Sequence, residues 1–188
     1  MYESWIKAAL DELERDFYFG YFQPQDEPDV RGYLYHTLLL LKPKIKGLTI
    51  NHIPTREYPC LNTQGNIDLA LIVKHLAQKN ENPYEPRLLA EVKETSLDYV
   101  TDNKRKKIIY DINKLLKERK DILEYAKNNM EISARANRVF NRFRRRVWMV
   151  VLFRGSGRQG IGAKTINEME ELKKKYDKHD VEIWYGPA

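Results

Sequence analysis

The chain has 188 residues, of which 42% are hydrophobic and 32% charged, so it can form one domain with a substantial core and is not intrinsically disordered. Lysine and arginine outnumber aspartate and glutamate by 33 to 27, and this net charge of +6 is a modest lean toward a polyanionic partner. The single cysteine, Cys60, excludes an intrachain disulfide and a cysteine-rich zinc site, and the longest apolar runs (38–41 and 147–153) are too short to span a membrane.

Two helices are expected at the start of the chain. Apolar residues at helical spacing predict a first helix over 2–19: Trp5, Ile6, Ala9, Leu10, Leu13 and Phe17. After the loop 20–25, Asp26 is a suitable N-cap for a second helix, which Pro43 and Gly47 bring to an end. Its apolar stripe consists of Val30, Leu34, Leu38 and Leu41. This charged, amphipathic start is unlike a signal peptide and favours a soluble, cytoplasmic protein.

Three strands are expected next. Residues 48–58 have β-branched character, and Pro54 within them interrupts the strand or marks a sheet edge. After a turn at 61–66, residues 67–73 alternate, with Ile67, Leu69, Leu71 and Val73 on one face and Asp68, Ala70 and Ile72 on the other. A polar loop (79–86) separates this strand from the next (87–95), and so we expect the two to pair in antiparallel fashion.

The second half of the chain predicts helices alternating with strands. A long amphipathic helix over 102–128 turns Ile108, Ile112, Leu115, Ile122 and Ala126 inward. The segments that follow are a helical stretch (131–146), a strand (147–153), a glycine-rich loop (155–162), a helix (164–178) and a strand (181–185). This order predicts an α/β fold with a central mixed sheet flanked by helices, and the last strand–helix–strand unit predicts a parallel crossover.

We interpret the whole chain, 1–188, as a single domain. It divides into N-terminal helices (1–46), a core with three strands and the long helix (47–153), and a C-terminal helix and strand (154–188).

Charged residues stand on one face of the strand 87–95. Leu88, Ala90 and Val92 share one face of it, whereas Leu89, Glu91 and Lys93 share the other. If this strand pairs with 67–73, Asp68 joins Glu91 and Lys93 in one patch. Two neighbouring carboxylates form a hard-oxygen site suited to Mg²⁺ or Mn²⁺, and a lysine beside them can orient an attacking water, help to deprotonate it, or offset phosphoryl charge.

The arrangement D-x22-E-x-K on two neighbouring strands, preceded by a helix with an acidic start, resembles the PD-(D/E)XK nuclease superfamily. The resemblance covers residues 26–153, and Ile67 stands where the family name has proline. It implies a restriction-endonuclease-like fold and a Mg²⁺- or Mn²⁺-dependent DNA endonuclease. Asp68, Glu91 and the Val92 carbonyl would be metal ligands, Lys93 the catalytic lysine, and Glu27 an additional acid of the active site.

Each of these residues has a plainer interpretation. E-x-K recurs at 118–120 and 171–173 on charged helices, and D-x-K at 102–104, so the string alone is common. Glu91 and Lys93 could pair on a solvated sheet face, and an acid such as Glu27 is favoured in any first helical turn. Tyr110 and Lys114 are auxiliary candidates on the long helix, although an ordinary Asp111–Lys114 pair is the favoured interpretation there.

Two further segments bear on the partner. Arg135, Arg138, Arg142 and Arg145 align on one helical face, which we interpret as contacting a phosphate backbone, with a solvated basic face as the alternative. The loop 155–160 matches GxGxxG, but no βαβαβ half surrounds it, and so nucleotide binding is disfavoured. Its Arg158 and the nearby Arg154 would instead reach DNA.

The sequence therefore predicts a DNA endonuclease. A non-catalytic nucleic-acid-binding module on the same fold is the alternative. The oligomeric state stays open, with a homodimer among the options.

Overall fold

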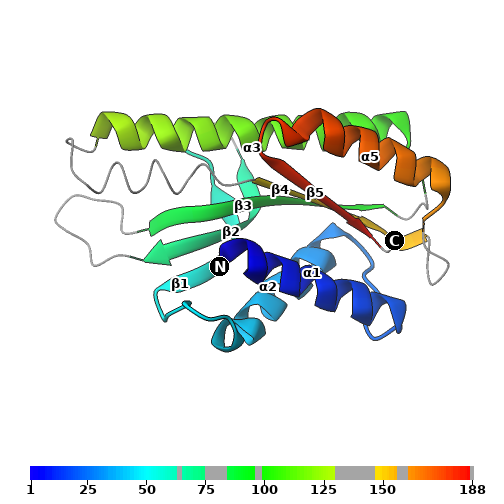
Figure 1. Cartoon of the computed structure of the whole chain (residues 1–188), viewed down its shortest axis with the longest axis horizontal. Coiled ribbons are helices and arrows are strands. Elements are labelled where there is room, and N and C mark those ends of the chain that lie inside the picture. The colour runs from blue at the N-terminus through cyan, green and yellow to red at the C-terminus, as the bar shows by residue number, and fades with distance from the viewer. Residues whose placement is uncertain (63–64, 75–83, 96–98, 130–146, 156–160, 187–188) are drawn as a thin grey trace.

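The computed structural model of the chain describes residues 1–62, 65–74, 84–95, 99–129, 147–155 and 161–186. A five-stranded sheet lies between two layers of helices, with α1 and α2 against one face and α3 and α5 against the other (Figure 1). The expected α/β class, with a mixed sheet flanked by helices, is confirmed. None of the described helices is long and apolar enough to cross a membrane.

The sheet joins an antiparallel half to a parallel half. Its strands lie in chain order, with β1 antiparallel to β2, β2 antiparallel to β3, and β3, β4 and β5 mutually parallel. Their bounds are β1 His52–Pro59, β2 Asn66–Lys74, β3 Tyr84–Thr95, β4 Val147–Phe153 and β5 Val181–Gly186. The expected β2–β3 pairing and the expected parallel crossover through α5 are both confirmed. Pro54 lies on the edge strand β1, where a missing backbone N–H costs no ladder bond.

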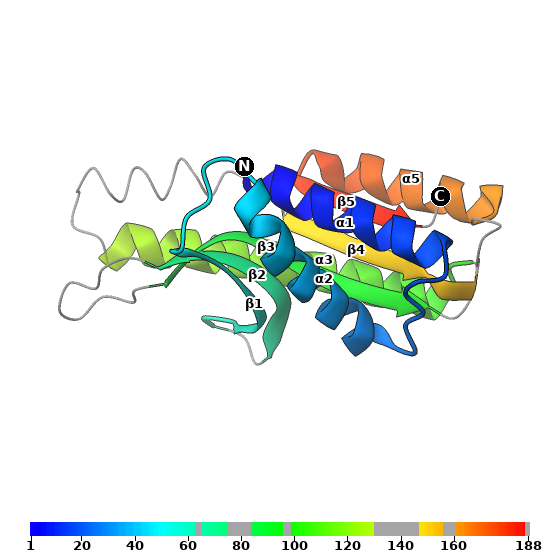
Figure 2. The same cartoon turned by 90° about the horizontal axis from the view of Figure 1, so that it is seen from below.

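Helices α1 (Tyr2–Tyr18) and α2 (Glu27–Leu41) cover one face, as Figure 2 shows from below. A short 3₁₀ turn, Lys42–Lys44, follows α2. The side chain of Asp26 accepts a hydrogen bond from the Asp29 backbone N–H, so the expected N-cap is confirmed. This cap fixes the start of α2 and therefore the direction in which Glu27 and Arg31 project.

Helices α3 (Asp102–Asn129) and α5 (Ala163–Asp177) cover the opposite face of the sheet. Their apolar residues pack with one side of the strands in a second cluster, which includes Ile108, Ile112, Leu115, Ile122, Met169 and Leu172. The expected inward face of α3 is therefore confirmed for its described side chains, whereas the side chain of Ala126 lies outside them.

Three expectations were wrong, one about the face on which a residue lies and two about where strands begin. Ile67 packs with Ala70 and Ile72 rather than with Leu69 and Leu71, because it stands at the end of β2, where the strand leaves β3. Residues 48–51 are not strand, since Thr49 closes a local turn with the His52 backbone N–H at 3.0 Å. The strand β3 begins at Tyr84 within the expected loop. The helical stretch expected at 131–146 lies outside the described residues, with 156–160 of the glycine-rich loop.

Candidate active site

The candidate site lies where β2 and β3 separate. Their antiparallel pairing ends with Leu69 opposite Ala90, whereas β3 continues beside β4 as far as Thr95. The stretch of β3 beyond Ala90 therefore has a strand on one side only. The carboxylate of Asp68 takes the vacated position: its Oδ2 accepts a hydrogen bond from the Val92 backbone N–H at 2.8 Å. A side chain thus replaces a ladder carbonyl, and an acidic group enters the sheet.

Asp68 is held from a second direction by helix α2. Its Oδ1 accepts a hydrogen bond from Arg31 Nη1 at 2.9 Å, and the residue is only 7% exposed. A buried carboxylate needs such donors because burial without them costs several kcal/mol. Arg31 was not among the sequence candidates, although its position one turn after Glu27 on the same helix was a usable signal.

Glu91 lies beside Asp68 and is 2% exposed. Burial raises its pKa to about 9, and the hydrogen bond and negative charge of Asp68 act in the same direction. Lys114 on α3 opposes this rise, with its Nζ 2.6 Å from Glu91 Oε1. Two adjacent carboxyls out of water favour keeping one proton between them unless a cation joins them.

Lys93 joins the two helical layers. Its Nζ lies 3.3 Å from both carboxylate oxygens of Glu27 and 3.0 Å from Asp111 Oδ2. Burial alone lowers the pKa of Lys93, but the charges of Asp111 and Glu27 outweigh it, and the net shift is upward. Lys93 is therefore a protonated hydrogen-bond donor in the site.

Further cations surround the end of β3. Arg154, just after β4, donates from Nε to Glu94 Oε1 at 2.8 Å. Lys104 on α3 donates to the Glu94 backbone carbonyl, and burial lowers the pKa of this lysine. Arg154, expected to reach DNA, is thus paired with an acid of the site strand.

The structure brings together most of the predicted site residues: Glu27, Asp68, Glu91, Val92, Lys93 and Lys114. Tyr110 is not among them, because its side chain is 69% exposed. The favoured Asp111–Lys114 pair was wrong, since Asp111 contacts Lys93 and Lys114 contacts Glu91. Asp111 is a site neighbour that the i, i+3 spacing concealed. The expected contacts of Arg135, Arg138, Arg142, Arg145 and Arg158 fall outside the described residues.

A divalent cation is compatible with the carboxylate pair. Within the described part of the chain, no three or more His, Cys, Asp and Glu side chains gather as a ready metal site. Asp68 and Glu91 nevertheless supply two hard oxygen groups. Burial, and after it the neighbouring Asp68, raise the pKa of Glu91, and a cation bound between the two carboxylates would oppose both effects. The donor chemistry therefore fits Mg²⁺ or Mn²⁺. Arg31 forms an ion pair with Asp68, and Lys114 forms one with Glu91.

Comparison with known proteins assigns no family. No family model matches the chain, and no curated protein matches it. Among solved structures, the chain is similar to Pyrococcus furiosus SfsA in complex with Ca²⁺, with 12% sequence identity and a TM-score of 0.34. The similarity covers 87% of this chain and 61% of that protein, so the chain spans less than two thirds of its length.

Proposed function

We propose that this chain is a metal-dependent nuclease of the PD-(D/E)XK type that hydrolyses phosphodiester bonds in DNA. One observation carries the proposal: Asp68 and Glu91 are neighbouring buried carboxylates, at the point where two strands separate, with Lys93 on the same strand. Buried acids are costly to hold in a sheet and require paired donors such as Arg31 and Lys114.

Three groups would hold the metal. The carboxylates of Asp68 and Glu91 and the backbone carbonyl of Val92 are oxygen donors of the kind that Mg²⁺ and Mn²⁺ take. When bound, the cation supplies Lewis-acid chemistry, which offsets the charge of a phosphoryl group. Arg31 and Lys114 form ion pairs with these two carboxylates.

The chain's own residues would then position the reactants. Hydrolysis joins a water oxygen to phosphorus and breaks the bond to one sugar oxygen, while the protons of the water end on the leaving oxygen and in solvent. The ammonium of Lys93 donates hydrogen bonds to the water or to a phosphoryl oxygen, where negative charge develops. Glu27 and Asp111 hold that ammonium from both helical layers.

A non-catalytic nucleic-acid-binding module is the second candidate, and one observation favours it. Asp68 and Glu91 pair with Arg31 and Lys114, and Lys93 pairs with two acids, so the network is complete without a metal. In that case the ion pairs would be structural, and phosphate contact would be the only activity.

A plasmid-nicking assay with and without Mg²⁺ or Mn²⁺ separates the two candidates. We expect metal-dependent nicking by the wild type and a loss of about a hundredfold or more in Asp68→Asn and Lys93→Ala. Lys173→Ala is the matched control, because Lys173 pairs with Glu170 on α5, away from the site. Circular dichroism checks that the variants fold. Wild-type nicking rates in folded Lys93→Ala would reject the nuclease mechanism.

A further inference from the structure

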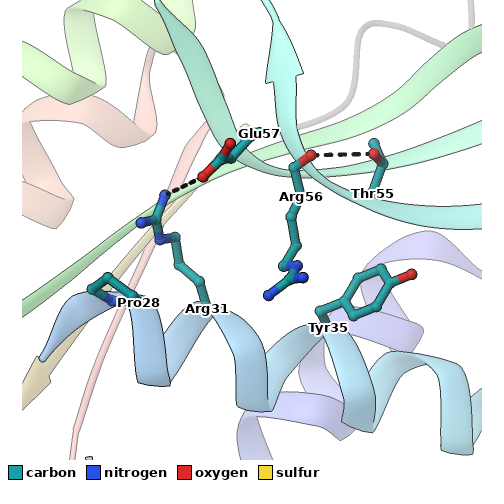
Figure 3. Close-up of a pocket in the computed structure, with 6 residues that line it drawn as sticks. All are labelled: Pro28, Arg31, Tyr35, Thr55, Arg56 and Glu57. Atoms are coloured by element: carbon teal, nitrogen blue, oxygen red, sulfur yellow. Dashed lines mark hydrogen bonds and ion pairs between the residues drawn. The ribbon is translucent and has the colours of Figure 1, made fainter. Parts of the chain in front are cut away.

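A pocket of about 430 Å³ opens between α2 and β1, next to the carboxylates. Its lining residues are drawn in Figure 3: Pro28, Arg31 and Tyr35 from α2, and Thr55, Arg56 and Glu57 from β1. Arg31 reaches from the helix toward the strand and Arg56 from the strand toward the helix, so two guanidinium groups face one space. Of these lining residues, Arg31 also contacts a carboxylate of the candidate site.

Arg31 connects the pocket to the site. Its Nη1 lies 2.9 Å from Asp68 Oδ1 and 3.9 Å from Glu57 Oε1. Both contacts use the same nitrogen, whereas a guanidinium carries five N–H donors. A ligand bound by the other N–H groups of Arg31 would therefore be separated from Asp68 only by the Arg31 guanidinium.

Arg56 is the second cation of the pocket. Its guanidinium carbon lies 5.1 Å from the centre of the Tyr35 ring, and the side chain is exposed. A guanidinium over a ring face still has N–H groups available for a planar or tetrahedral oxyanion. Among the residues that the structure describes, no carboxylate forms an ion pair with Arg56.

Glu57, which lines the pocket, has an unusual backbone conformation. Its φ of 52° lies in the left-handed region, which non-glycine residues adopt at a cost. The β1–β2 ladder pairs Arg56 with Leu69 and Tyr58 with Ile67, and omits Glu57, which is opposite Asp68. The strained residue therefore lies beside the first acid of the site, and its 63% exposed carboxylate faces Arg31.

We propose that this pocket binds a backbone phosphate of the nucleic-acid strand, one that neighbours the phosphate to be cleaved. The inference rests on the proposed function. Arginine forks pair with phosphate oxygens through two parallel N–H···O bonds, and the pocket supplies two such forks against one exposed carboxylate. The phosphate would compete with Glu57 for Arg31 while the contact between Arg31 and Asp68 fixes its distance from the reaction centre.

Binding of a fluorescent single-stranded oligonucleotide in EDTA tests the proposal. Cleavage cannot occur there, so the result reports on the pocket and not on the nuclease chemistry. We expect Arg56→Ala to weaken binding about tenfold and to lower the slope of log affinity against log salt by about one. Arg56→Lys, which keeps the charge without the fork, should recover only part of this loss. Glu57→Gln should tighten binding, since it removes the competing carboxylate.

The matched control is Arg105→Ala, because Arg105 lies on α3 against the opposite face of the sheet and pairs with Glu171. Its oligonucleotide affinity should stay at the wild-type value. Unchanged affinity and salt slope in a folded Arg56→Ala protein overturn the proposal. Thermal stabilisation by nucleoside monophosphate that disappears in Arg56→Ala, without an effect on oligonucleotide binding, also overturns it in favour of a free nucleotide. Arg56-dependent binding without any nicking in Mg²⁺ supports the pocket while rejecting the nuclease.

Discussion

At Lys93, side chains from both helical layers meet one ammonium group. Glu27 from α2 and Asp111 from α3 both lie within 3.3 Å of its Nζ. A lysine chain with four rotatable bonds needs such restraints to present its donors in one direction. In the proposed mechanism, Asp111 would therefore be a positioning residue that acts on the substrate only through Lys93.

Asp111→Ala should lower the nicking rate about tenfold to a hundredfold, the usual effect of losing a residue that orients a functional group. The substrate concentration for half-maximal rate should change little, because Asp111 has no contact with DNA in the proposal. Glu124→Ala, at an exposed position on the same helix, is the control. An equal loss in both variants would mean that α3 itself, and not Lys93, is disturbed.

Glu118 is a further buried acid, one helical turn beyond Lys114. It is fully buried, and its two carboxylate oxygens accept the Leu61 backbone N–H at 3.0 and 3.2 Å. Burial raises the pKa of Glu118, with the charge of Asp121 adding to the rise and the Leu61 hydrogen bond opposing it. The folded state therefore favours the protonated form more than the unfolded state does.

This shift predicts a pH-dependent stability. Because the folded pKa lies above the unfolded value, about 4.3 for glutamate, folding loses free energy as the pH rises from there through the folded pKa. Glu118→Gln keeps an oxygen acceptor and carries no charge. The free energy of unfolding of the variant, relative to that of the wild type, should therefore increase from pH 4 to pH 7. Urea unfolding at both pH values measures this difference. An identical difference at the two pH values would contradict the shift.

At the scale of elements, the sequence predicted those whose patterns are local. The stripes of α1 and α2 and the Asp26 cap follow from spacing alone, and β4 was predicted with its observed bounds because it is a continuous apolar run. The convergence of Asp68 with Glu91 and Lys93 required only that β2 and β3 pair.

The errors occur where contacts distant in sequence decide the outcome. Ile67 changes sides because β2 leaves β3 there, and no alternation pattern records where two strands part. Arg31 and Asp111 were missed for a similar reason, since each finds its partner on another element. The residues near them in the sequence suggested only ordinary interactions within a helix.

A buried hydrogen bond links helix α1 to α2. Trp5 Nε1 donates to the Leu38 backbone carbonyl at 2.8 Å, and Trp5 has no exposed surface. Trp5→Phe should lower the free energy of unfolding by about 1–3 kcal/mol, because it removes this donor and leaves a cavity. Leu40→Ala is the control: Leu40 is 74% exposed on α2, and its loss should cost less than about 0.5 kcal/mol. Urea unfolding measures both changes, and equal values would contradict the assigned role of Trp5.

At the scale of the whole molecule, the candidate site lies between the two helical layers. Arg31 approaches the carboxylates from α2, and Lys114 approaches them from α3. A divalent cation would have to displace or rearrange these contacts, so we expect binding in the millimolar range. The ion would then tie α2, the sheet and α3 into one unit.

Mg²⁺ should therefore raise the melting temperature in the absence of DNA. By linkage, a ligand at ten times its dissociation constant stabilises the folded state by about 1.4 kcal/mol. Asp68→Asn should abolish the shift, whereas the control Asp11→Asn, on α1, should retain it. Differential scanning fluorimetry across a Mg²⁺ series measures the effect. A wild-type melting temperature that ignores Mg²⁺ and Mn²⁺ would favour the non-catalytic module.

The position of β3 also bears on the order of events during synthesis. The Asp68–Val92 hydrogen bond spans 24 residues and the Glu27–Lys93 contact spans 66, and such distant contacts form late because loop closure costs entropy first. The other side of β3 is completed only by β4, whose first residue is Val147. A chain still on the ribosome would thus hold the acids and the lysine without their working geometry. We expect a nascent chain to lack the proposed nuclease activity until β4 has emerged and paired with β3.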